Sequence, residues 1–353
     1  MKNGVNVAAM SELMYEIHGE ANEGIFKYGS KVVWSGGDLL TASLPPTFIG
    51  SVKSPRRFNW QIALKDNIKH DTRLNSDSIY SPEEMALTGL GACALLTMVK
   101  GCTTRGISLE SLDFNLTAAL YSSPSSPLER SIGDIDYKIR LEAESDVDDE
   151  IFSELLQKLS GSSPNHRTII EPNSVSIKTD RERTINTLSE TPTDLEKSPI
   201  SISLNWDYGF QIHVDYDQNS NRRMLLDQPK QVGGIDLGAN PQEVILTSVA
   251  ACLMRSFIEL VQNQTLDVTS AEIDVNAFVD MHGMLGMDKN VPVKVQDINI
   301  NISIVGSADS SAINDLLSQA VNNSAISRLV IEGRSIQIGL YRNQTLISEI
   351  ISQ

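Results

Sequence analysis

One short passage of this chain occurs twice. "SPEEMALTGLGAC" ends at Cys93, and "NPQEVILTSVAAC" ends at Cys252. Aligned on these cysteines without a gap, the passages share proline, glutamate, leucine, threonine, alanine and cysteine. Farther on, "SPNHRTIIEPNSVSIK" from Ser163 corresponds to "SAISRLVIEGRSIQIG" from Ser324. Motifs that recur in the same order over about 100 residues indicate a tandem duplication.

The duplication divides the 353 residues into two halves of ordinary domain size. We expect a first domain over residues 1–185, with an amphipathic helix at its N-terminus, and a second domain over residues 186–353. The stretch "DRERTINTLSETPTDLEKSP", residues 180–199, is polar and has few large apolar side chains. This composition predicts a linker between the domains.

Each half presents its elements in the same order. Strands precede the cysteine helix, two strands follow it, and a second helix and a last strand end the repeat. "IDYKIRLEA" and "ININISIV" alternate apolar with polar residues, as half-buried strands do. We therefore predict an α+β fold in which mainly antiparallel sheets pack on central helices. We expect the two repeats to form an intramolecular pseudo-dimer about an approximate two-fold axis.

The start of each cysteine helix is strongly specified. Ser81 is a good N-cap, Pro82 fits the first helical position, and Glu84 completes a capping box. "NPQE" provides the same signals in the second copy, ending at Glu243. Gly89, inside the first helix, costs up to about 1 kcal/mol relative to alanine. Such a cost is expected where another element packs closely against the helix.

Composition excludes several classes of partner. The net charge is -16 and no cluster of basic residues occurs, so we expect neither a nucleic-acid nor a membrane partner. No apolar run reaches the roughly 18 residues of a membrane span. Three cysteines do not form a disulfide framework and favour a reducing cytoplasm. The five histidines share no ligand spacing, so we expect no metal site.

"GGIDLGANPQEVILTSVAACL" resembles the signature of the OsmC/Ohr family of thiol-dependent hydroperoxide reductases, and "SSPNHRTI" is similar to that family's second-cysteine region. The resemblance covers roughly residues 31–178 and 201–342. It implies the OsmC fold, in which two protomers intertwine and form sites at their interface. Here one chain would supply both protomers. We expect no cofactor.

The resemblance also implies roles for particular residues. In the family a first cysteine attacks the peroxide, a second resolves it as a disulfide, and an arginine and a glutamate hold the first as thiolate. Cys93 and Cys252 match the attacking position. Glu83 matches the glutamate, and the second copy has Gln242 there.

Two parts of the family pattern are missing. Ser163 and Ser324 occupy the second-cysteine position, and a hydroxyl cannot form a disulfide. "WSGGD" has Asp38 where the family arginine often stands, and Arg56 or Arg57 is a candidate substitute. Without a nearby cation a cysteine stays near pKa 8.5, so little thiolate is present at neutral pH.

Other residues have two interpretations each. Arg167 and Arg328 either bind an anion or form structural ion pairs, and we favour the ion pairs. Cys93 and Cys252 are either reactive or inherited core residues, since free cysteine is often buried. Cys102, whose counterpart is valine, is expected to be core packing. The Met-rich segment 281–290 either covers a pocket or is a surface insertion.

Two functions remain open from the sequence. One is reduction of an organic hydroperoxide at Cys93 and Cys252 as one-cysteine nucleophiles, with an external thiol as reductant. The other is a non-catalytic OsmC-fold protein that binds a small apolar ligand.

Helix geometry predicts a contact between the halves. Ten residues of helix rise about 15 Å, so Glu83 cannot reach Cys93 on its own helix unless the chain breaks near Gly89. If the two cysteine helices pack antiparallel across the pseudo-two-fold axis, Glu83 faces Cys252 and Gln242 faces Cys93.

Overall fold

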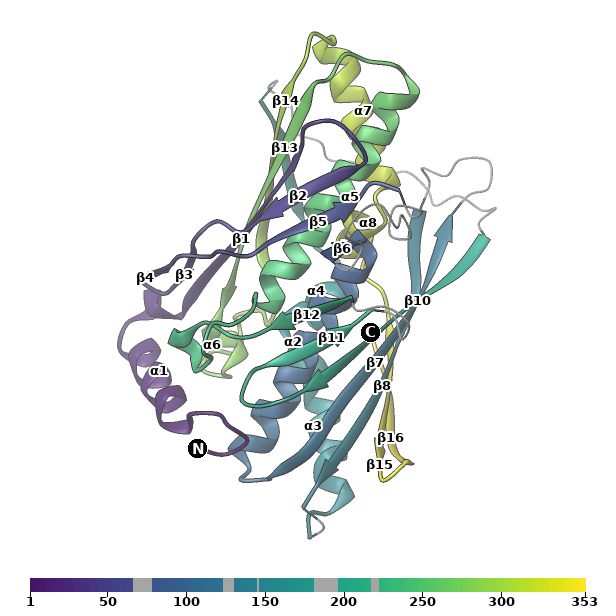
Figure 1. Ribbon diagram of the computed structural model, residues 1–353. Coiled ribbons are helices and arrows are strands. Elements are labelled where there is room, and N and C mark those ends of the chain that lie inside the picture. Colours follow the sequence, from purple (N-terminus) through teal and green to yellow (C-terminus); the bar gives the residue numbers. More distant parts are fainter. Residues whose placement is uncertain (66–77, 123–129, 145, 181–195, 217–221) are drawn as a thin grey trace.

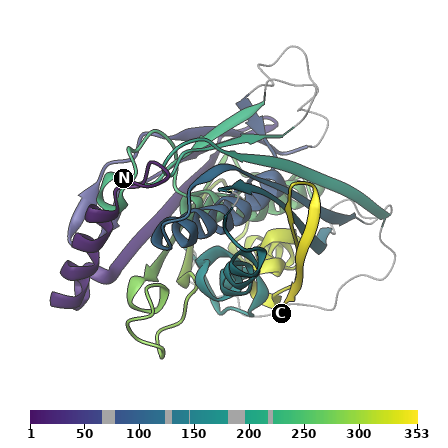
Figure 2. The same cartoon turned by 90° about the horizontal axis from the view of Figure 1, so that it is seen from below.

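Two long helices form the centre of the computed structural model (Figure 1). The structure describes residues 1–65, 78–122, 130–144, 146–180, 196–216 and 222–353. Helix α2 (Pro82–Thr104) carries Cys93, and helix α5 (Pro241–Asn263) carries Cys252. The two helices contact each other and lie between two sheets (Figures 1 and 2).

Both central helices begin as their sequences predict. Ser81 and Glu84 form a capping box at α2, and "NPQE" forms the same arrangement at α5. The helices then approach closely at Gly89, where a Cβ atom would lie 2.8 Å from the backbone nitrogen of Ile245. Asn165 bridges this contact by donating to the carbonyls of Gly89, at 2.7 Å, and of Pro241, at 3.0 Å. The glycine is therefore required by the approach of one backbone to the other.

Two sheets enclose these helices. The described strands of the first sheet are, in spatial order, β6 (Ile79–Tyr80), β5 (Asn59–Ala63), β2 (Leu39–Ser43), β1 (Ile25–Trp34), β13 (Ser270–Asp280), β14 (Gln296–Val305) and β9 (Val175–Thr179), with β3 (Thr47–Ile49) and β4 (Val52–Ser54) beside β1. Those of the second are β12 (Arg223–Leu226), β11 (Ile212–Asp215), β10 (Glu196–Trp206), β7 (Leu109–Ser122), β8 (Arg130–Ala143), β15 (Ile336–Arg342) and β16 (Thr345–Ser352). Most neighbouring strands are antiparallel, as predicted.

The halves exchange strands in both sheets. Strand β1 of the first half pairs with β13 of the second, with Val32 opposite Ile273. Strand β10 of the second half pairs with β7 of the first, with Leu204 opposite Phe114. At the far ends of the repeats, β9 pairs with β14 and β15 pairs with β8, in parallel. Each sheet is therefore built from both halves.

Shorter helices cover the remaining surfaces. They are α1 (Val7–Gly19), α3 (Asp149–Ser162), α4 (Pro164–Ile170), α6 (Met281–Met284), α7 (Ser310–Asn323) and α8 (Ala325–Glu332), with 3-10 turns η1 (Ala21–Gly24) and η4 (Lys230–Val232). Helix α3 packs against α2, and α7 packs against α5 in the equivalent place. The order of elements in each repeat agrees with the order predicted from sequence.

One hydrophobic cluster runs through both halves, as a pseudo-dimer with a shared core requires. Helices α2 and α5 are long and apolar enough to cross a membrane by length and hydropathy, but 83% and 94% of their apolar windows are buried inside the protein. They are core helices. Cys102 and its counterpart Val261 both belong to this cluster, which agrees with a packing role for Cys102.

The expected domain boundary near residue 185 and most of the expected linker, residues 181–195, lie outside the described residues. The division into 1–185 and 186–353 therefore stays a prediction. Strand β10 begins at Glu196, before the expected end of the linker at residue 199. Its first residues are exposed and are held by backbone pairing with β7, for which polar side chains are no obstacle.

Candidate functional site

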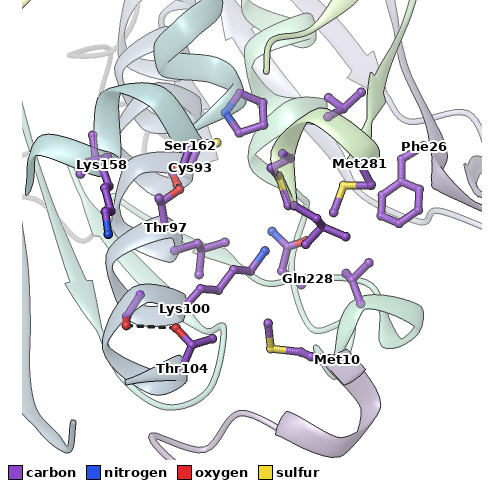
Figure 3. Close-up of a pocket in the computed structure, with 18 of the residues that line it drawn as sticks. Met10, Phe26, Cys93, Thr97, Lys100, Thr104, Lys158, Ser162, Gln228 and Met281 are labelled. Atoms are coloured by element: carbon purple, nitrogen blue, oxygen red, sulfur yellow. Dashed lines mark hydrogen bonds between the residues drawn. The ribbon is translucent and has the colours of Figure 1, made fainter. Parts of the chain in front are cut away.

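Cys93 lies in the wall of a cavity between the two halves (Figure 3). The cavity has a volume of about 360 Å³, within the range of small-molecule sites. Elements α1, β1, α2 and α3 of the first half and β13 and α6 of the second contribute to its wall. The apolar lining residues include Met10, Met14, Phe26, Leu96, Leu155, Leu159, Pro164, Val232, Val279, Met281, Met284 and Leu285. Part of the Met-rich segment thus forms one side of a pocket.

The Cys93 sulfur has polar neighbours from both halves. Gln242 Nε2 donates to it across the pseudo-dimer at 3.3 Å. Ser163 and the backbone N–H of Asn165 lie near the sulfur and lower the pKa of its thiol. Burial raises the pKa of the Cys93 thiol above its ordinary value, and these groups together with Lys100 offset only part of the rise. Cys93 is therefore mainly a neutral thiol at pH 7.

Cys252 lies in an ionic and closed environment. Its side chain has 0% exposure, against 4% for Cys93, and it is not among the residues that line the cavity. Arg255, one helical turn later, places Nη2 3.8 Å from the Cys252 sulfur. The Glu83 carboxylate binds the same guanidinium from the start of α2, with Nη1 to Oε2 at 3.1 Å.

Burial and charge oppose each other at this second site. Burial raises the pKa of the Cys252 thiol, Arg255 lowers it and Glu83 raises it, and the result lies above the ordinary value. Burial also opposes ionisation of Glu83, but the charge and hydrogen bonds of Arg255 overcome it and hold the Glu83 pKa at about 2. Glu83 and Arg255 therefore form a buried ion pair that joins the two central helices.

Equivalent positions of the repeat explain why the sites differ. With Cys93 aligned on Cys252, Glu83 corresponds to Gln242 and Arg255 corresponds to Leu96. The first site thus has neither member of the ion pair. It is neutral beside the sulfur and open to the cavity, whereas the second is charged and sealed.

The antiparallel contact predicted from sequence is present. Gln242 reaches Cys93, and Glu83 reaches the arginine beside Cys252, each from the opposite half. Ser324 lowers the pKa of Cys252 as Ser163 lowers that of Cys93, although the Ser324 hydroxyl donates to Ser327 Oγ at 2.9 Å. Each second-cysteine position is therefore adjacent to the cysteine of its own repeat.

A family model described as OsmC-like protein matches the chain twice, at residues 75–179 and 233–339, which together make up more than half of it. The chain belongs to the OsmC-like family. The two matches agree with the tandem duplication, and each contains one of the two central cysteines. None of the curated proteins compared with the chain matches it.

The two arginines of the OsmC-like second-cysteine regions lie away from the sulfurs. Arg167 pairs with Glu171, and Arg328 Nη2 lies 2.5 Å from Glu332 Oε1. Each pair joins positions one helical turn apart on a short helix. These are the structural ion pairs that the sequence favoured.

Buried arginines also bind the capping glutamates. Arg56 Nε lies 2.7 Å from Glu243, and Arg222 Nη2 lies 2.6 Å from Glu84. These contacts fix the starts of α5 and α2 and do not reach a cysteine. Arg56 therefore does not take the place of the family arginine beside the sulfur, and Arg57 is exposed.

Sequence reasoning missed Arg255 and Lys100. Arg255 is the one basic residue of α5 and is spaced three residues from Cys252, and this spacing was the available signal. Lys100 is seven residues after Cys93, which places it on nearly the same helix face. Both lie on the cysteine helices themselves, whereas the sequence search for a cation looked near the first strand.

The described part of the site contains neither a disulfide nor a set of metal ligands. All three cysteines are unpaired thiols. Within the residues that the structure describes, no three histidine, cysteine or acidic side chains cluster as metal ligands. The first site offers an apolar cavity, a thiol, an amide donor and an ammonium group, which suit binding or a reaction at sulfur.

Proposed function

We propose that this OsmC-like protein binds a small, largely apolar molecule in the cavity beside Cys93. The observation that carries the proposal is the lining, in which apolar side chains from both halves surround a few polar groups. This composition is typical of small-molecule sites. Met10, Met14, Met281 and Met284 contribute flexible thioether chains, which adapt to ligands of different shape.

Binding accounts for the site better than a two-cysteine peroxidase cycle does. Such a cycle needs an accessible thiolate and a second thiol to resolve it. Burial raises the pKa of Cys93, and Ser163 cannot form a disulfide. Cys252 has an arginine beside it but no exposed surface. Neither cysteine is therefore both accessible to a peroxide and held as a thiolate.

The test uses N-phenyl-1-naphthylamine, a neutral dye whose fluorescence rises in apolar sites. Thr97 lines the cavity, and Thr97→Trp should fill part of it and weaken dye binding at least about tenfold. Thr117→Trp, at an exposed position on β7, is the matched control and should bind as wild type does. Unchanged dye affinity in Thr97→Trp would contradict the proposal.

Thiol labelling gives an independent readout. A bound ligand should slow alkylation of Cys93, because its sulfur lies in the cavity wall. Cys252 should stay unreactive in the native protein with or without ligand, and should react only after denaturation. A ligand that leaves the alkylation rate of Cys93 unchanged would place binding elsewhere.

One-cysteine reduction of an organic hydroperoxide is a second candidate, favoured by the position of Cys93 beside Gln242 and Lys100. The thiol would take the terminal peroxide oxygen, giving an alcohol and a sulfenic acid. An external thiol would then form a mixed disulfide and water, and a second would release Cys93. This supply of thiols fits a cytoplasmic protein. Peroxide consumption with added thiol should be lost in Cys93→Ser and retained in Cys252→Ser.

A further inference from the structure

Lys100 brings a positive charge into the cavity. Its side chain extends from α2 into the space that Gln228, Met10 and Met281 also border (Figure 3). The ammonium lies 5.3 Å from the ring centroid of Phe210. Among the described residues no carboxylate forms an ion pair with it. Burial lowers the pKa of Lys100, as expected for an ammonium that lacks a nearby anion.

The rest of the lining adds to this charge. It contains Arg105 and Lys158, both exposed, and no acidic side chain. The chain as a whole has 45 acidic residues and a net charge of -16. A cavity wall with basic residues and no acidic one is therefore a positive region in an acidic protein. Such a region attracts anions.

Gln228 offers a second donor. Its side-chain oxygen accepts a hydrogen bond from Asn240 Nδ2 at 2.8 Å, so its amide nitrogen is the group left to donate. No acceptor for that nitrogen occurs among the described residues. Gln228 and Lys100 both line the cavity, so one bound oxyanion can receive hydrogen bonds from an amide and an ammonium group.

At the equivalent place in the second half, charged side chains of the protein pair with each other. Glu259 corresponds to Lys100 in the aligned repeat. Its carboxylate lies 3.8 Å from Arg130, whose charge also acts on Glu83. There the protein supplies both signs of charge. In the first half the protein supplies the cation, Lys100, and no carboxylate of the described residues pairs with it.

We propose that the cavity binds an anion with a single apolar chain, whose headgroup contacts Lys100 Nζ and the Gln228 amide and whose chain lies among the methionine and leucine side chains. This inference rests on the proposed binding function and adds the charge of the ligand to it. Carboxylate and sulfate headgroups share the required chemistry, a singly charged oxyanion.

The experiment compares three probes with the same chain: decanoate, decyl sulfate and 1-decanol. Each is measured by displacement of N-phenyl-1-naphthylamine from the wild-type protein. At least one of the two anions should bind about tenfold or more tightly than decanol, as expected for a charge-assisted hydrogen bond. The tighter of the two anions identifies the headgroup.

Lys100→Met tests the residue. It should abolish the preference for the anion over decanol. Decanol and the dye should bind with unchanged affinity, and their binding shows that the cavity of the variant is intact. Lys178→Met is the matched control, because Lys178 is an exposed lysine on β9 that does not line the cavity, and it should keep the preference.

Three results would overturn the inference. The first is equal affinity of both anions and decanol for the wild type. This result would reject the anion preference but not the proposed binding of an apolar molecule. The second is an anion preference that survives Lys100→Met or is lost equally in Lys178→Met. The third is failure of dye and decanol to bind at all, which would also reject the proposed function.

Discussion

Cys93 and Cys252 occupy matched positions in the two repeats, but two neighbouring positions give them different surroundings. Glu83 and Arg255 accompany Cys252, and Gln242 and Leu96 stand at the equivalent places around Cys93. Both members of the ion pair are absent from the first site, so neither is left buried there without the other. Loss of one member alone would have left such a charge.

This comparison predicts the stability of variants at the second site. Glu83→Gln should lower the free energy of unfolding by about 3–5 kcal/mol, because Arg255 stays buried without its carboxylate. Glu83→Gln/Arg255→Leu reproduces the pair found at the first site and should recover most of that loss. Urea unfolding measures both variants. A double variant no more stable than the single one would argue against the pairing.

The same ion pair predicts a dependence on pH. The pKa of Glu83 is lowered from 4.5 to about 2, so between these values the folded state binds fewer protons than the unfolded state. Its stabilising contribution is complete above about pH 4.5 and is lost as the pH falls toward 2. Wild type should therefore lose stability over this range more steeply than Glu83→Gln. Parallel curves from urea unfolding at several pH values would be inconsistent with this.

Ser163 predicts what restoring the second cysteine would do. Its hydroxyl is near enough to lower the pKa of the Cys93 thiol and has no hydrogen-bond partner among the described residues. In Ser163→Cys, mild oxidation should join Cys93 to the introduced thiol and stabilise the protein by about 2–4 kcal/mol. Peptide mapping by mass spectrometry detects the bond. Two unpaired thiols after oxidation, with unfolding unchanged, would exclude this geometry.

At the scale of elements, Gly89 and Gly91 of α2 are small for different reasons. A Cβ atom at Gly89 would lie 2.8 Å from the Ile245 backbone nitrogen, whereas one at Gly91 would meet only the side-chain ends of Leu116 and Leu204, at 2.9 Å. Leucine side chains can move, and a helix start held by a capping box cannot move as easily.

Gly89→Ala should therefore destabilise the protein by about 1–3 kcal/mol despite the gain in helix propensity. Gly91→Ala is the matched control, since the second repeat has Ala250 at that place, and it should be close to neutral. Thermal unfolding compares the two. Equal destabilisation would mean that the approach of the helices is not what requires Gly89.

The elements that sequence predicted best are those with local signals. Capping boxes marked the starts of α2 and α5, alternating residues marked β8 and β14, and the repeat predicted the antiparallel contact of Glu83 and Gln242. The pairing of Arg222 with Glu84 was not predicted, because residues so far apart in the chain meet only through the fold. An interface site was expected from the family resemblance, but most of the residues that line the cavity were not predicted, since its wall comes from both halves.

At the scale of the whole molecule, the exchange of strands makes each half part of the other's sheets. Strand β1 needs β13, and β7 needs β10, while one hydrophobic cluster extends through both repeats. Neither half can unfold without exposing the core and sheet edges of the other. The two repeats therefore constitute one cooperative unit.

Calorimetry should accordingly show a single unfolding transition whose van't Hoff and calorimetric enthalpies agree. Urea unfolding followed by fluorescence and by circular dichroism should give coincident curves. Two resolved transitions, each with about half of the enthalpy, would indicate that the repeats unfold independently.

Joining the repeats in one chain also has a consequence for inheritance. In a homodimer one codon change alters both symmetry-related positions, so neither site can vary while the other stays the same. In this chain a codon change alters one position only, which is how Lys100 and Glu259 come to occupy equivalent places. One site can keep the ion pair that joins the central helices, while mutation and selection are free to fit the other to a different molecule.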